Sequence, residues 1–222
     1  MSSAPLPDIV VFDLDGTLVD SIPGLTLAVN RVLAHLGRRA LSADEVRGMV
    51  GEGLDMLLAR GLAATGEALD PGPLRALWFE VYGATVEEGT RPYPGAEALL
   101  DRLRDQGCRI GLCTNKPQAP TEQILATLGW RGRFGSVLGA DAVPRRKPDP
   151  DHLLRVVAAL GPGRAAYVGD SITDVQTAQA AGIPIVLLAH GYSNQDPASL
   201  GADVLVADLG GVEAALRGLR GG

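Results

Sequence analysis

IVVFDLDGT, residues 9–17, places two aspartates directly after a continuous run of four apolar residues. Such a run predicts a strand that is buried on both faces, as in a parallel sheet. An Asp-Gly pair on its own indicates a tight turn, which explains Asp15 and Gly16 but not Asp13. A carboxylate at the end of a buried strand costs free energy of desolvation unless a cation or hydrogen-bond donors meet it. We therefore expect partners for Asp13 at the ends of other strands.

Short apolar runs of the same kind recur along the chain, and helical patterns separate them. The runs lie at residues 109–113, 136–138, 165–168, 184–188 and 203–206. Between them, apolar residues spaced three and four apart predict amphipathic helices that end at glycines. The alternation of strand and helix predicts an α/β fold with a doubly wound parallel sheet.

Residues 22–91 interrupt this alternation, because they show helical patterns only. Ser42 followed by Glu45 has the spacing of a capping box. A segment of about seventy residues is too long for an ordinary crossover between two strands. We predict an inserted α-helical cap domain over residues 22–91, and an α/β catalytic core formed by residues 1–21 and 92–222.

Within the predicted cap, two glycines flank Glu52 just before a helical pattern. This arrangement is typical of a loop that reaches a ligand, so Glu52 and Gly53 are candidate substrate contacts. An ordinary turn is the alternative interpretation.

Composition excludes several classes of partner. The net charge is −6 and no basic block is present, which argues against nucleic-acid binding. No apolar stretch is long enough to span a bilayer, and the first residues do not resemble a signal peptide. Two cysteines are too few for a disulfide framework. We expect a cytoplasmic protein without a membrane partner, and both monomer and homodimer remain open.

Polar residues follow the later strands at the corresponding places. Thr114 and Asn115 follow residues 109–113, Lys147 lies before a helical pattern, and Asp170 follows residues 165–168. Each has an ordinary explanation when taken alone, as a helix cap or a surface lysine. In an open parallel sheet, however, the carboxyl ends of the strands converge at the point where the strand order reverses, which is where ligands bind. We predict that these residues share one site with Asp13.

Phosphoryl transfer is the chemistry that suits such a site. Asp13 is ionised at neutral pH and can attack phosphorus to form an aspartyl-phosphate. Asp15 can protonate the leaving oxygen and then deprotonate the hydrolytic water. Two unit charges 4 Å apart repel by about 4 kcal/mol at an effective dielectric constant near 20, so the attack on a phosphate needs a counter-charge.

Mg²⁺ would supply that counter-charge through hard oxygen ligands. Its predicted ligands are Asp13, Asp170 and the main-chain carbonyl of Asp15. Lys147 adds a further positive charge, and Thr114 can donate a hydrogen bond to phosphate oxygens. Ser171 and Asp174 are expected to support the reacting groups, with Asp174 orienting Lys147 or a metal-bound water.

These motifs, taken in order, resemble those of the haloacid dehalogenase superfamily of aspartate-nucleophile phosphatases. They are DLDGT at 13–17, TN at 114–115, KP at 147–148 and GDSITD at 169–174. The resemblance implies Mg²⁺ dependence, phosphate binding by Thr114, Asn115 and Lys147, and a mobile cap that closes over the substrate. Residues 50–62 and 91–117 look most like phosphoglycolate phosphatases, which makes 2-phosphoglycolate the first candidate substrate.

Several alternatives share this pattern. Related enzymes act on sugar phosphates, nucleotides or pyrophosphate, and a phosphomutase would pass the phosphoryl group to a second sugar phosphate. A non-catalytic binding protein is the remaining alternative. The acid at Asp15 argues against the true dehalogenases, whose motif lacks one there.

Overall fold

A single parallel sheet organises the computed structural model, which describes residues 4–192 and 195–219. Within these residues six strands follow the order β5-β4-β1-β6-β7-β8. They are β1 (Ile9–Phe12), β4 (Arg109–Cys113), β5 (Ser136–Leu138), β6 (Ala165–Gly169), β7 (Ile185–Leu188) and β8 (Val204–Val206). Phe12 of the central strand β1 lies beside Leu112 on one side and Val168 on the other. The predicted doubly wound sheet is confirmed, and its order reverses at β1.

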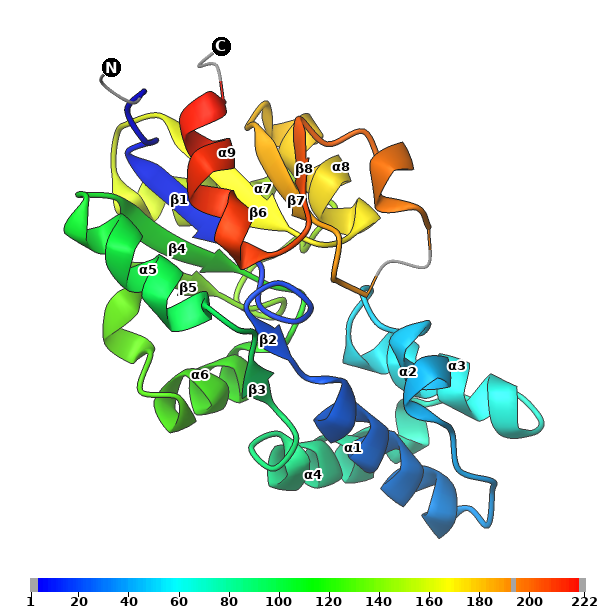
Figure 1. Ribbon diagram of the computed structural model, residues 1–222. Coiled ribbons are helices and arrows are strands. Elements are labelled where there is room, and N and C mark those ends of the chain that lie inside the picture. The colour runs from blue at the N-terminus through cyan, green and yellow to red at the C-terminus, as the bar shows by residue number, and fades with distance from the viewer. Residues whose placement is uncertain (1–3, 193–194, 220–222) are drawn as a thin grey trace.

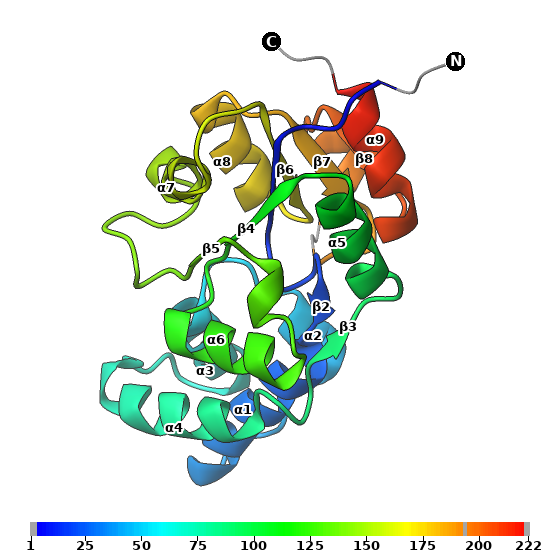
Figure 2. The same ribbon diagram turned by 90° about the vertical axis from the view of Figure 1, so that its left-hand side faces the viewer.

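Helices cover both faces of the sheet. Figure 2 shows α5 (Ala96–Asp105) and α9 (Val212–Gly218) on one side, with α7 (Pro150–Leu160) and α8 (Ile172–Ala181) on the other. Side chains of β1 alternate between these layers, so that Val10 and Phe12 belong to one apolar cluster and Ile9 and Val11 to another. This double burial explains why the strand is a continuous apolar run.

Local caps fix the two helices that follow the later motifs. The Asp149 side chain accepts a hydrogen bond from the Asp151 backbone N–H at the start of α7. Ser171 and Asp174 form a capping box at the start of α8, and Gly182 ends that helix in the left-handed conformation. Helix α6 (Gln118–Thr127) follows β4. The capping box orients the first turn of α8 next to the end of β6.

The helical insertion lies beyond the carboxyl ends of the strands, as Figure 1 shows. It contains α1 (Ile22–His35), α2 (Ala43–Arg47), α3 (Leu54–Thr65) and α4 (Arg75–Thr85). The predicted capping box of Ser42 and Glu45 is present at the start of α2. The chain enters and leaves this region through a short antiparallel pair, β2 (Val19–Asp20) and β3 (Arg91–Pro92).

An α-helical cap inserted after the first strand is therefore part of the fold, whereas its boundaries at residues 22 and 91 stay a prediction. Residues 1–3, 193–194 and 220–222 of the predicted core lie outside the described residues. Short 3₁₀ turns are present at Gly72–Leu74, Arg131–Arg133, Pro197–Ser199 and Leu209–Gly211. None of the helices in the described ranges combines the length and the apolar character needed to cross a membrane.

Candidate active site

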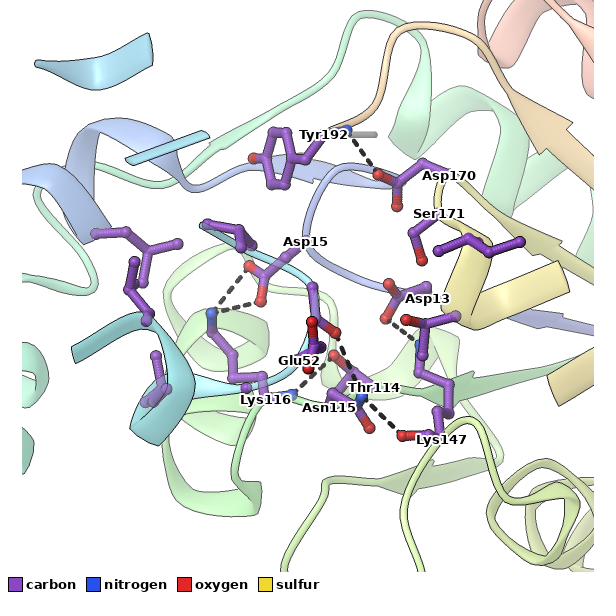
Figure 3. A pocket seen from close by; sticks show the side chains of 18 of the residues that line it. Asp13, Asp15, Glu52, Thr114, Asn115, Lys116, Lys147, Asp170, Ser171 and Tyr192 are labelled. Carbon is purple, nitrogen blue, oxygen red and sulfur yellow. Dashed lines mark hydrogen bonds and ion pairs between the residues drawn. The ribbon is translucent and has the colours of Figure 1, made fainter. Parts of the chain in front are cut away.

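A cavity of about 410 Å³ lies between the sheet and the cap. Figure 3 shows Asp13, Asp170 and Lys147 on one side of it, and Asp15 with Lys116 on the other. Thr114 and Asn115 lie between the two groups. The structure thus brings together nearly all the predicted site residues along its wall, namely Asp13, Asp15, Glu52, Gly53, Thr114, Asn115, Lys147, Asp170 and Ser171.

Asp13 occupies the end of the central strand and is 8% exposed. Its backbone N–H donates to Val168 O at 2.9 Å, which continues the pairing of β1 with β6. Lys147 Nζ lies 3.0 Å from Asp13 Oδ1. This contact is an ion pair, and no other donor among the described residues reaches Oδ1. Burial raises the pKa of Asp13 to about 7, against the opposing charge of Lys147.

Lys147 also donates hydrogen bonds to two buried side chains. Its Nζ donates to Asp174 Oδ1 at 2.7 Å and to the Tyr167 hydroxyl at 2.9 Å. Burial alone would lower the pKa of Lys147, but the charges of Asp13 and Asp174 raise it above its usual value. The ammonium therefore stays charged and points at Asp13.

Asp170 lies in a socket formed by Gly16, Thr17, Gly191 and Tyr192. Thr17 Oγ1 donates to its Oδ1 at 2.9 Å, and the Tyr192 backbone N–H donates to its Oδ2 at 2.8 Å. A Cβ at Gly16 or at Gly191 would overlap the Asp170 side chain. Gly16 also has a φ of 83°, a left-handed conformation that favours glycine. Burial, followed by the charges of Asp174 and Asp13, raises the pKa of Asp170 well above its usual range.

Asp174 lies behind the cavity wall and is fully buried. Its Oδ2 accepts hydrogen bonds from the backbone N–H groups of Asp170 and Ser171 and from Ser171 Oγ, the last at 2.6 Å. Its Oδ1 accepts from Lys147 and Tyr167. Burial raises the pKa of Asp174, but Lys147 and these donors outweigh it and hold the pKa below its usual value. The contacts agree with the expected orienting role, which stays a prediction.

An acidic cluster at this place is able to bind a metal ion. Carboxylate oxygens of Asp13, Asp170 and Asp174 lie within 4.8 Å of one another. Asp13 and Asp170 line the cavity, whereas Asp174 lies behind its wall, so Asp13 and Asp170 are the two that a metal ion in the cavity would meet. The pKa values of both are raised by burial, so a cation would relieve the cost of their charges. Oxygen donors in such a cluster suit a hard cation.

Lys116 is a residue of the site that the motifs did not single out. Its Nζ donates to both oxygens of Asp15, at 2.9 and 2.7 Å, and its side chain is 1% exposed. Although burial would lower it, the pKa of Lys116 is raised by the charge of Asp15. A lysine directly after Thr114 and Asn115 was visible in the sequence, but nothing local indicated its partner.

Thr114 and Asn115 connect loops at the centre of the site. Thr114 Oγ1 accepts from the Lys116 backbone N–H at 3.2 Å. Asn115 Nδ2 donates to Lys147 O at 3.1 Å and to Gly51 O of the cap loop at 3.4 Å. Phosphate binding by these two residues stays a prediction.

Tyr192 is the second residue that sequence reasoning missed. Besides its backbone bond to Asp170, its hydroxyl accepts from the Ser21 backbone N–H at 2.7 Å and donates to Asp20 Oδ1 at 2.9 Å. It therefore joins the acidic cluster to the segment that enters the cap. No motif surrounds Tyr192, so the sequence held no signal for this contact.

Comparisons with known proteins show which family the chain belongs to. A family model described as a haloacid dehalogenase-like hydrolase matches residues 7–182. The chain is 43% identical over 213 residues to the phosphoglycolate phosphatase of Rhodospirillum rubrum, covering 92% of this chain and 88% of that protein. It is 45% identical over 186 residues to the phosphoglycolate phosphatase of Cereibacter sphaeroides, covering 82% of this chain and 85% of that protein.

The fold is similar to the crystal structure of a predicted phosphoglycolate phosphatase from Haemophilus somnus. The TM-score is 0.83 at 27% sequence identity, over 94% of this chain and 97% of that one. The expectation of a phosphoric monoester hydrolase is confirmed at that level by the relatives. The resemblance of the four motifs is confirmed as well: this chain belongs to the haloacid dehalogenase-like hydrolase family.

Proposed function

We propose that this hydrolase is a Mg²⁺-dependent phosphatase of a small phosphorylated metabolite, with 2-phosphoglycolate as the first candidate substrate. One observation carries the proposal. Asp13 ends a buried strand beside Lys147, with an oxygen that no other donor among the described residues reaches and with the cavity in front of it. The carboxylate therefore has the Lys147 ammonium on one side and the open cavity on the other, where an electrophile or a second cation can reach it.

Asp13, Asp170 and the main-chain carbonyl of Asp15 would hold the Mg²⁺. The bound ion would supply positive charge that offsets the repulsion between these carboxylates and the phosphate. The raised pKa values of Asp13 and Asp170 support this assignment, because burial makes both charges costly without a cation. The close approach of Gly16 and Gly191 to Asp170 also supports it, since the carboxylate is held in one position.

In the first half-reaction, Asp13 forms a bond to phosphorus while the bond from phosphorus to the leaving oxygen breaks. Asp15 enters this step in its protonated form, donates the proton to that oxygen and becomes the carboxylate that pairs with Lys116. In the second half-reaction, Asp15 takes a proton from a water that attacks the phosphorus. The bond between phosphorus and Asp13 breaks, so inorganic phosphate leaves and the Asp13 carboxylate is restored.

Other residues orient this exchange. Lys147 lies 3.0 Å from Asp13 and would contact the phosphate oxygens as charge moves onto them. Thr114 and Asn115 would donate to the same oxygens. Asp174 and Ser171 keep Lys147 and the first turn of α8 in place. Lys116 holds Asp15 at the cavity wall.

The substrate assignment is supported by size and by the relatives. A cavity of about 410 Å³ roofed by cap residues favours a small molecule. Relatives of 43% and 45% identity that cover most of the chain carry the name phosphoglycolate phosphatase. A cytoplasmic location, the absence of nucleic-acid partners, and the choice between monomer and homodimer stay predictions.

Phosphate release from a panel of phosphorylated metabolites tests the proposal. The panel contains 2-phosphoglycolate, a hexose 1-phosphate, a nucleoside monophosphate and pyrophosphate. We expect the highest kcat/KM for 2-phosphoglycolate in the presence of Mg²⁺. Conversion of the hexose 1-phosphate to its isomer without phosphate release would instead identify a phosphomutase. No turnover of any member would favour a binding protein.

A further inference from the structure

The cationic side chains along the cavity differ in how accessible they are to a ligand. Among the described residues that line it, only Arg60, Lys116 and Lys147 are cationic. Lys116 and Lys147 are almost fully buried and are paired with catalytic carboxylates. Arg60 differs because it comes from cap helix α3 and its side chain is 34% exposed. It is the cation that a ligand in the cavity can reach from the cap side.

The guanidinium of Arg60 has one backbone partner and one side-chain partner, and a ligand can replace the side-chain partner. Its Nη1 donates to the backbone oxygen of Met49 at 3.0 Å. Its Nη2 contacts a carboxylate oxygen of Glu52, whose side chain is 54% exposed. An ion pair between partners exposed to this extent contributes little to stability. A second carboxylate can therefore replace Glu52 while the bond to Met49 keeps the guanidinium in position.

The loop that carries Glu52 is docked on the catalytic residues. Gly51 O accepts a hydrogen bond from Asn115 Nδ2 at 3.4 Å. Arg60 is tied to this loop at Met49 and at Glu52, so its guanidinium is oriented relative to the end of β4. The phosphate of a substrate and the far end of its leaving group would then meet different walls of one cavity.

We propose that Arg60 binds the carboxylate of the substrate's leaving group, and that Glu52 occupies Arg60 when the substrate is absent. This inference rests on the proposed function, because it assumes a phosphate ester whose leaving group is an anion. Arginine suits the task, since its planar fork can donate two parallel hydrogen bonds to one carboxylate. This proposal also changes the expected role of Glu52, whose charge repels an anionic substrate. Glu52 becomes a competitor for Arg60 instead of a substrate contact.

A purely structural role makes the opposite prediction for Glu52. If Arg60 only braces the loop, losing either partner of the ion pair loosens the same contact. The variants Glu52→Gln and Arg60→Gln would then change KM in the same direction, for every substrate. If Arg60 receives the substrate carboxylate, the two variants change KM in opposite directions, and only strongly for a substrate with a carboxylate.

Two substrates and three variants separate these roles. The substrates are 2-phosphoglycolate and 2-hydroxyethyl phosphate, in which a neutral hydroxymethyl group replaces the carboxylate. Arg60→Gln is expected to raise KM for 2-phosphoglycolate about tenfold more than KM for the neutral ester, as for a lost charged hydrogen bond. Glu52→Gln is expected to lower KM for 2-phosphoglycolate by about two- to fivefold.

Arg31→Gln serves as the matched control. Arg31 lies on cap helix α1, its side chain is 46% exposed, and it forms an ion pair with Glu88 at 3.9 Å. It does not line the cavity. This variant removes a cap arginine of similar exposure and should change KM for both esters by the same small factor.

Equal effects of Arg60→Gln on both esters, or a rise in KM for 2-phosphoglycolate in Glu52→Gln, would overturn the inference. If Arg60→Gln fails to fold, the sign of the Glu52→Gln effect still decides. Hydrolysis of the neutral ester but not of 2-phosphoglycolate by the native chain would overturn the inference and leave a phosphatase. Phosphate release from neither ester, nor from the wider panel, would end the proposed function itself.

Discussion

Lys116 and Asp15 form an ion pair in which one buried ammonium contacts both oxygens of a partly buried carboxylate, at 2.7 and 2.9 Å. The ring of Tyr82, on cap helix α4, lies over the same ammonium with its centroid 5.2 Å from Nζ. The Lys116 ammonium, in the loop after β4, therefore contacts both Asp15, the proposed acid and base of the reaction, and the cap. Rupture of this pair leaves the carboxylate of Asp15, which is 14% exposed, without its counter-ion.

Lys116→Met is accordingly expected to lower the free energy of unfolding by about 3 kcal/mol. It should also reduce kcat more for an alkyl phosphate than for a nitrophenyl phosphate, whose leaving group needs little protonation. Urea unfolding and the ratio of the two kcat values provide the measurements. Lys116→Arg, which keeps the charge, is the control. Native stability together with an unchanged ratio would show that Lys116 does not position Asp15.

Asp13→Asn is expected to reduce turnover of an aryl phosphate by about 10⁴-fold or more, because an amide oxygen is a poor nucleophile toward phosphorus. The fold should persist, since burial raises the pKa of Asp13 and its charge does not stabilise the folded chain. Circular dichroism and thermal unfolding check the fold, and released phosphate reports turnover. Substantial turnover by a folded variant would remove Asp13 as the nucleophile.

Asp15→Ala provides a direct view of the intermediate. Without the base that activates water, the phosphorylated form of Asp13 should accumulate when an aryl phosphate is the substrate. Intact-protein mass spectrometry after acid quenching should then show a gain of one phosphoryl group. The double variant Asp13→Asn, Asp15→Ala should show none. A gain of mass in that double variant would place the phosphoryl group on another residue.

Gly191→Ala tests the socket around Asp170. An added Cβ would overlap the Asp170 side chain, whereas one at Gly132 would meet no atom within 4 Å. Neither glycine has a positive φ, so both substitutions are free of backbone strain. We expect Gly191→Ala to weaken Mg²⁺ affinity by about 10- to 100-fold, as for groups that orient a metal ligand. Titration calorimetry gives the affinities, and equal values for the two variants would contradict this account.

Removal of the metal should abolish the activity reversibly. Activity is expected to vanish in EDTA and to return with Mg²⁺ but not with Ca²⁺, which prefers more ligands and a looser geometry. Mg²⁺ at about 100 times its Kd should raise the free energy of unfolding by about 2.7 kcal/mol. Asp170→Asn should lose most of this gain. Full activity in chelator would rule out the proposed site.

His152 predicts a dependence of stability on pH. It is fully buried, and burial lowers its pKa to about 4 from an ordinary value of 6.5. Its Nε2 lies 3.0 Å from Leu138 O, and its Nδ1 lies 3.4 Å from the Lys147 backbone N–H, which requires a neutral ring. Between pH 6.5 and 4 the unfolded chain binds more protons at this residue. Its contribution to stability is therefore complete above pH 6.5 and is lost as the pH falls toward 4.

Chemical unfolding at pH 7 and pH 4.5 measures this effect. The native chain should lose about 1 to 3 kcal/mol more of its unfolding free energy than His152→Gln over that interval. Parallel losses in both proteins would show that other groups account for the acid sensitivity.

Local patterns of the sequence determine much of the fold and of the candidate site. The double burial of β1, the caps of α7 and α8 and the helical insertion all follow from residues close together in the chain. The convergence of Asp13, Thr114, Lys147 and Asp170 on one cavity follows as well, because the carboxyl ends of parallel strands share one edge of the sheet.

Several other contacts of the site were decided only by the tertiary structure. Lys116 and Asp15 are separated by 101 residues, and Tyr192 and Asp170 by 22. Glu52 could be recognised as a residue of the cap loop, but its ion pair with Arg60 could not. Local patterns fix where each side chain leaves the backbone, because they depend on periodicity and capping. Which partner it meets depends on how loops from separate strands and from the cap close on one another, and that closure exists only in the folded chain.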